Sequence, residues 1–344
     1  MKKYNVAILG ATGAVGQEFL RLIAERNFPF AELKLLASAR SAGKIINFLD
    51  KAYTVEEARP ESFDNVHIAL FAGGAASKEF AHEAVRRGAV VIDNSSAFRM
   101  DIDVPLVVPE VNPQDIRKHK GIIANPNCST IIMCMALKPI YDAVKIKRIV
   151  VSTYQAVSGA GKEAIDELDD QVQAIIEGRH VEAHILPSAS LPKHYQIAFN
   201  LLPQIDVFLD NGYTKEEMKM VHETHKILGD STIGVTATTV RVPVYRSHSE
   251  SINLELADQL SVVKAKELLA AFPGVIVQDN PAEMVYPMPL FTSDKDEVFV
   301  GRIRRDDTVP YGLNMWVVGD QIRKGAALNA LQIAEYMIKE SLIS

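Results

Sequence analysis

The sequence of 344 residues is poor in cysteine and has no excess of basic charge. Its two cysteines, Cys128 and Cys134, form neither a CxxC pair nor a disulfide framework, which favours a reducing compartment. The formal net charge of −6 lacks the basic footprint of a non-specific nucleic-acid binder. The apolar stretch Val6–Leu9 is too short for the core of a signal peptide, and no window reaches the length of a membrane span. We therefore expect a cytoplasmic protein that engages neither membranes nor nucleic acid.

Signatures of a metal site are also missing. His180 and His184, like His222 and His225, have a spacing that suits metal ligands, but neither pair belongs to an HExxH motif. No cysteine or acidic cluster joins them in the sequence, so we expect no metal. What is present is an ordinary globular composition, with 48% hydrophobic residues in a chain long enough for two domains.

The first half of the chain predicts a dinucleotide-binding domain. Val6–Leu9 is typical of a central parallel strand, and Gly10, Gly13 and Gly16 follow it at once, before apolar residues at helical spacing. Such glycines let the backbone approach a pyrophosphate at the N-terminus of the helix. The spacing is GxxGxxG and not GxGxxG, so the turn alone is a moderate signal. Its place at the first strand–helix junction strengthens it.

The end of the next predicted strand, Leu33–Ala37, bears on the choice of cofactor. NAD sites usually place an acidic residue there for the ribose 2′-hydroxyl, whereas NADP sites place a cation and hydroxyl groups. The chain has Ser38, Arg40 and Ser41 and no carboxylate. We interpret this segment as a 2′-phosphate site; the alternative is a solvated loop with one arginine.

Strands and helices alternate onward, which predicts a doubly wound parallel α/β sheet. Gly73 follows a predicted strand at 66–71, at the carboxyl end where such sheets bind ligands. We expect residues 1–127 to form this domain, completed by a C-terminal helix within 322–344 that covers the sheet. Residues 128–321 would form an α+β catalytic and dimerisation domain with a mixed or antiparallel sheet.

The segment Asn125-Pro126-Asn127-Cys128 delivers a cysteine to the first turn of a predicted helix. The helix dipole and unpaired backbone N–H groups favour a thiolate there and could hold an oxyanion. The thiol would then lie beside the nicotinamide crevice. For a random cysteine, however, a buried structural role is the more common one.

The second half contains further polar residues on predicted elements. Gln155 ends a β-branched run at 149–154, and a helix predicted over 216–228 would place Glu216 and Lys219 on one face. Considered alone, the Glu216–Lys219 pair is typical of an exposed salt bridge on a helix. The segment 177–211 is only weakly periodic, so we expect irregular structure there.

Two strands are predicted next. In the first, Val240, Val242 and Val244 share one face and Arg241 points the other way; in the second, His248 continues an apolar face. A lone histidine on such a face is more often packed in the core than catalytic.

Seven motifs in order resemble the aspartate-β-semialdehyde dehydrogenase family from end to end. This resemblance implies a homodimeric two-domain enzyme that reduces β-aspartyl phosphate with NADPH to aspartate β-semialdehyde, on the route to lysine, methionine and threonine. It leaves open whether dimers pair into tetramers. The motifs are GATGAVGQ at 10–17, NSSAFRM at 94–100, NPNCST at 125–130, YQAVSGAG at 154–161, EEMK at 216–219, RVPVYRSHSE at 241–250 and GDQIRKGAALNA at 319–330.

The resemblance also implies a role for each matching residue. Cys128 would be the acyl-enzyme nucleophile, His248 the acid–base catalyst and Gln155 the residue that orients the acyl group. Arg241 and Glu216 would bind the substrate α-carboxylate and α-ammonium. The phosphate ligands would be Arg99 and Lys219, and the NADP contacts Gly10, Thr12, Gly13, Ala14, Val15, Ser38, Arg40, Ser41, Gly73, Ser158, Gly159, Pro187 and Gln321.

Two alternatives remain at this point. N-acetyl-γ-glutamyl-phosphate reductase shares the architecture and the cysteine chemistry, but an acetamide does not call for an acidic partner such as Glu216. A catalytically silent nucleotide-binding homologue would be expected to lack the thiol or the histidine, and the chain has both.

Overall fold

The computed structural model describes residues 2–343, and the chain divides into two compact units. Unit 1 comprises the chain up to Asn127 together with the segment from Gly325, and unit 2 runs from Cys128 to Lys324. Within the described residues, no helix is long and apolar enough to cross a membrane.

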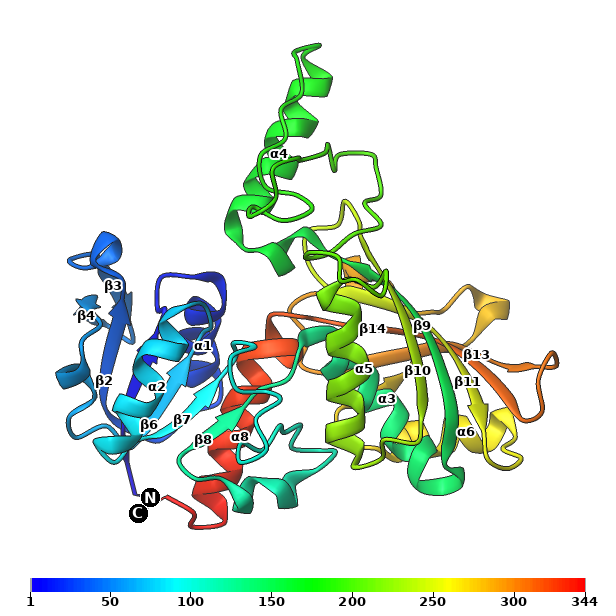
Figure 1. Ribbon diagram of the computed structural model, residues 1–344, viewed down its shortest axis with the longest axis horizontal. Coiled ribbons are helices and arrows are strands. Elements are labelled where there is room, and N and C mark those ends of the chain that lie inside the picture. The colour runs from blue at the N-terminus through cyan, green and yellow to red at the C-terminus, as the bar shows by residue number, and fades with distance from the viewer. Residues whose placement is uncertain (1, 344) are drawn as a thin grey trace. The chain divides into compact units, whose positions relative to one another are not determined.

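Unit 1 is built on a six-stranded parallel sheet (Figure 1). The central strands are short apolar runs that are buried on both faces, as parallel sheets require. Helices α1 (Ala14–Glu25) and α2 (Ala76–Arg86) connect them, and a small hairpin pairs β3 (Ile45–Phe48) with β4 (Lys51–Thr54). In order across the sheet, the strands are β5 (Glu56–Glu57), β2 (Phe30–Ala37), β1 (Tyr4–Leu9), β6 (Ile68–Phe71), β7 (Val90–Asp93) and β8 (Ile122–Ala124).

The C-terminal helix belongs to this unit. Helix α8 (Leu328–Lys339) contacts α1, β6 and β7, and its apolar side chains belong to the same core as those of α1. Within the predicted range 322–344, a π-helical turn at Arg323–Ala327 precedes α8. Such turns interrupt α-helical hydrogen bonding and leave no trace in hydrophobic periodicity.

Unit 2 contains a second six-stranded sheet, and it is mixed, so the predicted fold class is confirmed. Helices α3 (Cys128–Val144), α5 (Lys215–Leu228) and α6 (Val262–Ala271) pack on it, and a short α7 (Pro289–Thr292) precedes its last long strands (Figure 1). The strand order is β10 (Gly234–Arg241), β9 (Ile146–Gln155), β11 (His248–Leu256), β14 (Gly312–Gly319), β13 (Val298–Asp306) and β12 (Val275–Val277).

The segment between α4 (Lys162–Ile176) and α5 has the irregular structure that the sequence predicts. Residues 177–211 form no helix or multi-residue strand, yet their apolar side chains build a small core with α4. One prediction about β10 was wrong: the strand ends at Arg241, so Val242 and Val244 lie beyond it. Pro243 lacks the N–H that a sheet needs, and the chain turns there.

The close approach of Gly10 and Gly16 in unit 1 yields a stability prediction. A β-carbon on Gly16 would lie 2.2 Å from the Gly10 carbonyl oxygen and 2.7 Å from the Ala11 α-carbon, both of them backbone atoms. We expect Gly16→Ala to lower the free energy of unfolding by about 1–3 kcal/mol, the usual cost of overpacking. Gly13→Ala is the matched control, because its β-carbon meets nothing closer than 3.5 Å. Denaturant unfolding of both variants checks this, and equal losses would contradict it.

Candidate active site

Three predicted site residues lie in one row across the sheet of unit 2. Arg241 pairs with Gln155 where β10 and β9 end, and His248 opens β11 on the other side of Gln155. All three side chains are buried, with His248 fully enclosed. The sheet therefore brings together residues that are almost 100 positions apart, on the face that α3 and α5 cover.

The side-chain amide of Gln155 contacts several of the buried polar groups in this row and around it. Its amide nitrogen Nε2 donates to Glu216 Oε1 at 3.3 Å and lies 3.3 Å from His248 Nε2, while its Oε1 accepts from Thr153 Oγ1 at 3.0 Å. Glu216 comes from the first turn of α5, which a capping box between Thr214 and Glu217 anchors. The Gln155 amide, at the end of β9, therefore contacts the first turn of α5 and the first residue of β11.

The His248 ring has a defined tautomer. The backbone N–H of Ala156 donates to Nδ1 at 3.1 Å, so the neutral ring carries its proton on Nε2. Burial, together with the charge of Arg241, lowers the pKa of His248 to about 3, although Glu216 opposes the shift. The imidazole is therefore neutral at physiological pH. Its Nε2–H and the Gln155 amide can both donate to a single acceptor oxygen of a ligand.

Arg241 is a buried cation with spare hydrogen-bonding capacity. Its Nη1 donates to the Ala156 carbonyl at 2.7 Å, but Nε meets no partner among the described residues. Burial lowers the pKa of Arg241, and the charges of Glu216 and Cys128 counteract that shift. A buried N–H without a partner is costly, so this side chain is suited to a ligand that brings an acceptor.

Gly159 leaves the room that this arrangement needs. A β-carbon there would lie 2.8 Å from Arg241 Nη1, 3.2 Å from His248 Cε1 and 3.3 Å from His248 Nε2. The sequence interpretation assigned Gly159 to the cofactor. Within unit 2, the space that a side chain at this position would need is next to the guanidinium and the imidazole.

Cys128 is the first residue of α3 and is half-buried, at a position where the positive end of the helix dipole favours negative charge. The effect of its charge on Arg241 shows that the two lie within electrostatic range. The other cysteine, Cys134, is fully buried, and burial raises the pKa of its thiol far above the usual range. Only Cys128 has the setting of a nucleophile.

Lys219 does not stand apart from Glu216 in this structure. Its Nζ lies 3.0 Å from Glu216 Oε2 and 3.2 Å from Asp206 Oδ2, on the face that the helical spacing predicts. Arg99 belongs to unit 1, where its Nε donates to the Asn125 carbonyl at 2.9 Å and its Nη2 to the Asn94 carbonyl at 2.8 Å. Their common role as phosphate ligands stays a prediction.

The predicted cofactor residues of unit 1 lie at the carboxyl ends of its strands. Gly10 has a φ of +85°, and Gly13 caps α1 without a side-chain hydrogen bond, which leaves the N–H groups at Ala14 and Val15 to a ligand. Arg40 is exposed in a short turn after β2, and its side chain has no hydrogen bond or ion pair with any described residue. Thr12, Ser38, Ser41 and Gly73 occupy the same strand-end loops.

A cavity of about 340 Å³ lies beside α2 in the same unit. It follows the ends of β6 and β7, and the sequence placed Gly73 after the first of these strands, but three polar lining residues, Lys78, Ser95 and Ser96, were missed. The signal was available for the two serines, because they lie two and three residues after β7. The lining residues are Gly74, Ala75, Lys78, Ser95, Ser96 and Ala97.

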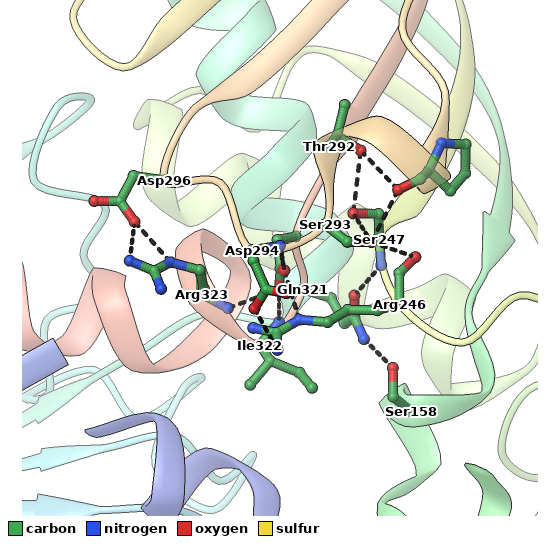
Figure 2. Close-up of polar contacts among 12 residues, drawn as sticks. Ser158, Arg246, Ser247, Thr292, Ser293, Asp294, Asp296, Gln321, Ile322 and Arg323 are labelled. Carbon is green, nitrogen blue, oxygen red and sulfur yellow. Dashed lines mark hydrogen bonds and ion pairs between the residues drawn. The ribbon is translucent and has the colours of Figure 1, made fainter. Parts of the chain in front are cut away.

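Four of the predicted cofactor contacts, Ser158, Gly159, Pro187 and Gln321, lie in unit 2. Gln321 Nε2 donates to Ser158 Oγ, and its Oε1 accepts from the Ser247 N–H at 2.8 Å (Figure 2). Pro187 is buried in the small core beside α4, after a cis peptide bond. Within residues 2–343, no group of histidine, cysteine and acidic side chains could hold a metal ion.

Glu250 is a buried acid that sequence reasoning overlooked as a site feature. It lies one pair along β11 from His248, on the same face, and opposite Thr153 of β9. Its side chain is fully enclosed, and neither carboxylate oxygen has a hydrogen-bond partner among the described residues. Burial therefore raises the pKa of Glu250 well above its ordinary value of 4.5.

The pKa of Glu250 leads to a prediction about stability and pH. A carboxyl group whose pKa is raised by folding stabilises the protein below 4.5, and that contribution is lost as the pH rises toward the folded-state pKa, at about 1.4 kcal/mol per pH unit. We expect Glu250→Gln, which is neutral at every pH, to unfold later than wild type at pH 7. The difference should shrink to nothing near pH 4.5.

Denaturant unfolding of both proteins from pH 4.5 to 8 measures this difference. Protonation of His248 destabilises both proteins alike at acid pH, so it cancels. A constant difference across the range would show that Glu250 is ionised in the folded protein.

Comparisons with known proteins agree with this two-unit architecture. The family described as "Semialdehyde dehydrogenase, NAD binding domain" matches residues 5–119, and "Semialdehyde dehydrogenase, dimerisation domain" matches 137–324. The aspartate-semialdehyde dehydrogenase of Aquifex aeolicus is 59% identical over 344 residues, 99% of each chain. That of Bacillus subtilis is 54% identical over 341 residues, 98% of this chain and 99% of its own.

Solved structures give the same result. A Vibrio cholerae aspartate semialdehyde dehydrogenase II complexed with ASA matches with a TM-score of 0.93 and 48% identity, over 98% of this chain and 99% of that one. A Candida albicans aspartate semialdehyde dehydrogenase with NADP matches with a TM-score of 0.75 and 27% identity, over 98% of each chain. The matches define a two-domain dehydrogenase with a nicotinamide-dinucleotide-binding domain. More particularly, the chain belongs to the aspartate-semialdehyde dehydrogenase family, which confirms the resemblance drawn from its motifs.

Proposed function

We propose that this enzyme reduces β-aspartyl phosphate to aspartate β-semialdehyde with NADPH, through a thioester on Cys128. The row Arg241–Gln155–His248 beside a helix-start cysteine carries the proposal, because it gathers a nucleophile, a carboxylate ligand and two donors for an acyl oxygen in one buried site. Its product would feed the synthesis of lysine, methionine and threonine.

The chemistry follows from these groups. The Cys128 sulfur attacks the acyl phosphate carbon, the bond to phosphate breaks, and a thioester remains. A thioester accepts hydride more readily than an oxygen ester because sulfur donates less strongly to the carbonyl. His248 Nε2–H and the Gln155 amide stabilise the oxygen as it gains charge. His248 then exchanges a proton with that oxygen as the thiolate departs.

Recognition of the amino acid rests on Arg241 and Glu216. The planar fork of Arg241 suits the α-carboxylate, and its unpaired Nε supplies a donor for it. Losing that buried charge-assisted contact should cost roughly 2–5 kcal/mol of binding. Glu216 is a buried acid in the same site and suits the α-ammonium group, which an N-acetylated substrate lacks. Lys219 and Arg99 would bind the phosphate.

The described residues of unit 1 fit an NADP cofactor. The start of α1 offers backbone N–H groups to the pyrophosphate, and Arg40, which has no protein partner, would bind the 2′-phosphate. Bound there, NADPH supplies the hydride. Thr12, Ser38 and Ser41 add hydroxyl groups along the same strand-end loops.

We also propose that the enzyme is a cytoplasmic homodimer. The open face of the unit 2 sheet carries the Tyr154–Trp316 ring pair beside a cavity of about 360 Å³. Met284, Leu290 and Phe291 are large and exposed nearby along the chain. A second copy would cover this apolar surface, in keeping with the match to a dimerisation domain. The need for a reduced Cys128 favours the cytoplasm.

The reverse reaction tests the proposed activity. With aspartate semialdehyde, inorganic phosphate and NADP, the absorbance of NADPH should rise only when phosphate is present. Cys128→Ala should abolish turnover and Cys128→Ser should impair it severely. Cys134→Ala is the matched control and should keep the activity, because that thiol is buried in the core.

Mass spectrometry of quenched enzyme should find the acyl group on Cys128. Turnover with N-acetyl-γ-glutamyl semialdehyde and none with the aspartyl compound would support the alternative reductase. No turnover with either would leave a silent homologue.

The cofactor assignment makes a separate prediction. Arg40→Ala should weaken the binding of NADPH much more than that of NADH, because only NADPH carries the phosphate that the guanidinium would bind. Lys44→Ala is a suitable control, since it removes an exposed cation a few residues away. Fluorescence titration with both nucleotides measures the effect. Equal losses for NADPH and NADH in Arg40→Ala would remove this assignment.

A further inference from the structure

Asp320 is a fully buried carboxylate that organises the end of β14. Its Oδ1 accepts from the backbone N–H groups of Ile322 and Arg323, each at 2.9 Å. Its Oδ2 accepts from Arg246 Nε at 2.6 Å and from the Asp294 N–H at 2.7 Å. Four donors thus satisfy one buried charge, and one of them comes from the loop that leads into β11.

Gln321, the next residue, binds the same loop before β11 at Ser247, one position after Arg246. Its Oε1 accepts from the Ser247 N–H, and its Nε2 donates to Ser158 in the glycine turn after β9 (Figure 2). That turn also contains Ala156, whose N–H fixes the His248 ring. Asp320 and Gln321 therefore connect both chain segments that determine where the imidazole lies.

Ser247, whose N–H bonds Gln321 and which follows Arg246 directly, has a strained backbone conformation. Its φ is +73°, in the left-handed region that residues with a β-carbon avoid. It is fully buried, and its hydroxyl bonds Thr292 Oγ1 at 3.1 Å and Ser293 Oγ at 3.2 Å (Figure 2). Strain of this kind persists only where the surroundings hold it. His248 follows directly, so the backbone of Ser247 sets the direction in which that side chain leaves the strand.

We propose that Asp320 is a positioning residue for His248: through Arg246 and Gln321 it holds Ser247 in the left-handed conformation that aims the imidazole at the acyl oxygen. The inference rests on the proposed function, because it concerns the proton exchange that His248 performs there. Asp320 itself touches no reacting atom. It acts through the Arg246 side chain and through Gln321, which together set the backbone of Ser247.

Asp320→Asn is the direct test. If the asparagine oxygen accepts from the N–H groups of Ile322 and Arg323, its NH₂ group faces the Arg246 guanidinium and the Asp294 N–H. These groups are all donors, so the two hydrogen bonds to Arg246 and Asp294 are lost. We expect the first-turnover rate of NADPH formation in the reverse reaction to fall roughly 10- to 100-fold, as misplaced catalytic groups do. The KM values should change little, and the solvent isotope effect (H₂O against D₂O) on that rate should rise, because proton exchange becomes limiting.

Asp296→Asn is the matched control. It weakens another carboxylate–arginine contact in the same region, that of Asp296 with Arg323 Nε at 2.7 Å, and Arg323 is as buried as the site residues (Figure 2). Its first-turnover rate and isotope effect should match wild type. If both variants lose rate alike with unchanged isotope effects, Asp320 is merely structural and the proposal is overturned.

A second pair of variants addresses Ser247 without removing the buried charge. Ser247→Gly and Ser247→Ala both lose the hydroxyl, but only glycine adopts positive φ without strain and frees the backbone. We expect the glycine variant to be the more stable protein and to show the larger isotope effect. The opposite order of isotope effects would overturn the proposal, even if Asp320→Asn failed to fold.

The fraction of Cys128 that is acylated in each quenched sample separates this proposal from the proposed function. Absence of the adduct in wild type would defeat the function itself. Full acylation in wild type with unchanged proton exchange in every variant would defeat only the role of Asp320.

Discussion

The site depends on the burial of a permanent positive charge next to a neutral imidazole. Arg241 and His248 lie on the two strands that flank Gln155, and the charge of Arg241 disfavours the charged form of His248. Glu216 offsets this repulsion from the start of α5, and a thiolate at Cys128 would offset it further. Positive charge in the resting site therefore favours the groups that the reaction brings, namely a carboxylate, a phosphate and an oxyanion. Burial, aided by the same charge, keeps the imidazole neutral by lowering the pKa of His248.

The sheet extends this polar character inward by one further row. Thr239, Thr153 and Glu250 lie side by side beneath the Arg241–Gln155–His248 row, and Thr153 bonds the Gln155 amide from below. The next row is apolar, with Val151 and Ile252 at its centre. A protonated Glu250 adds a polar group beneath the site without adding a charge. An ionised one would favour the imidazolium form of His248, which lies one residue pair away.

Sequence reasoning predicted the elements better than the contacts among them. The glycine turn, the parallel sheet and the helix that begins at Cys128 all depend on local patterns, so they could be read directly. The pairing of β10 with β9 is non-local, and without it nothing in the sequence places Arg241 beside Gln155. Periodicity also misjudged the end of β10, because Val242 and Val244 continue the alternation after the strand has stopped. The buried acids Glu250 and Asp320 escaped notice because a carboxylate looks solvated in a sequence.

These overlooked acids show how the fold distributes its stability. Among the described residues, Glu250 has no hydrogen-bond partner and Arg241 Nε has none either, and Ser247 has a left-handed backbone; all three lie within a few residues of His248 along the strands or across the sheet. Asp320 has the opposite character, because four donors satisfy it completely. A fully bonded buried carboxylate is rigid, and its rigidity can hold a strained neighbour in place. The groups of Glu250 and Arg241 that lack hydrogen-bond partners among the described residues belong to the proposed substrate site, whereas the fully bonded Asp320 supports the loop before β11. This division is expected if local instability is confined to places where a bound ligand can relieve it.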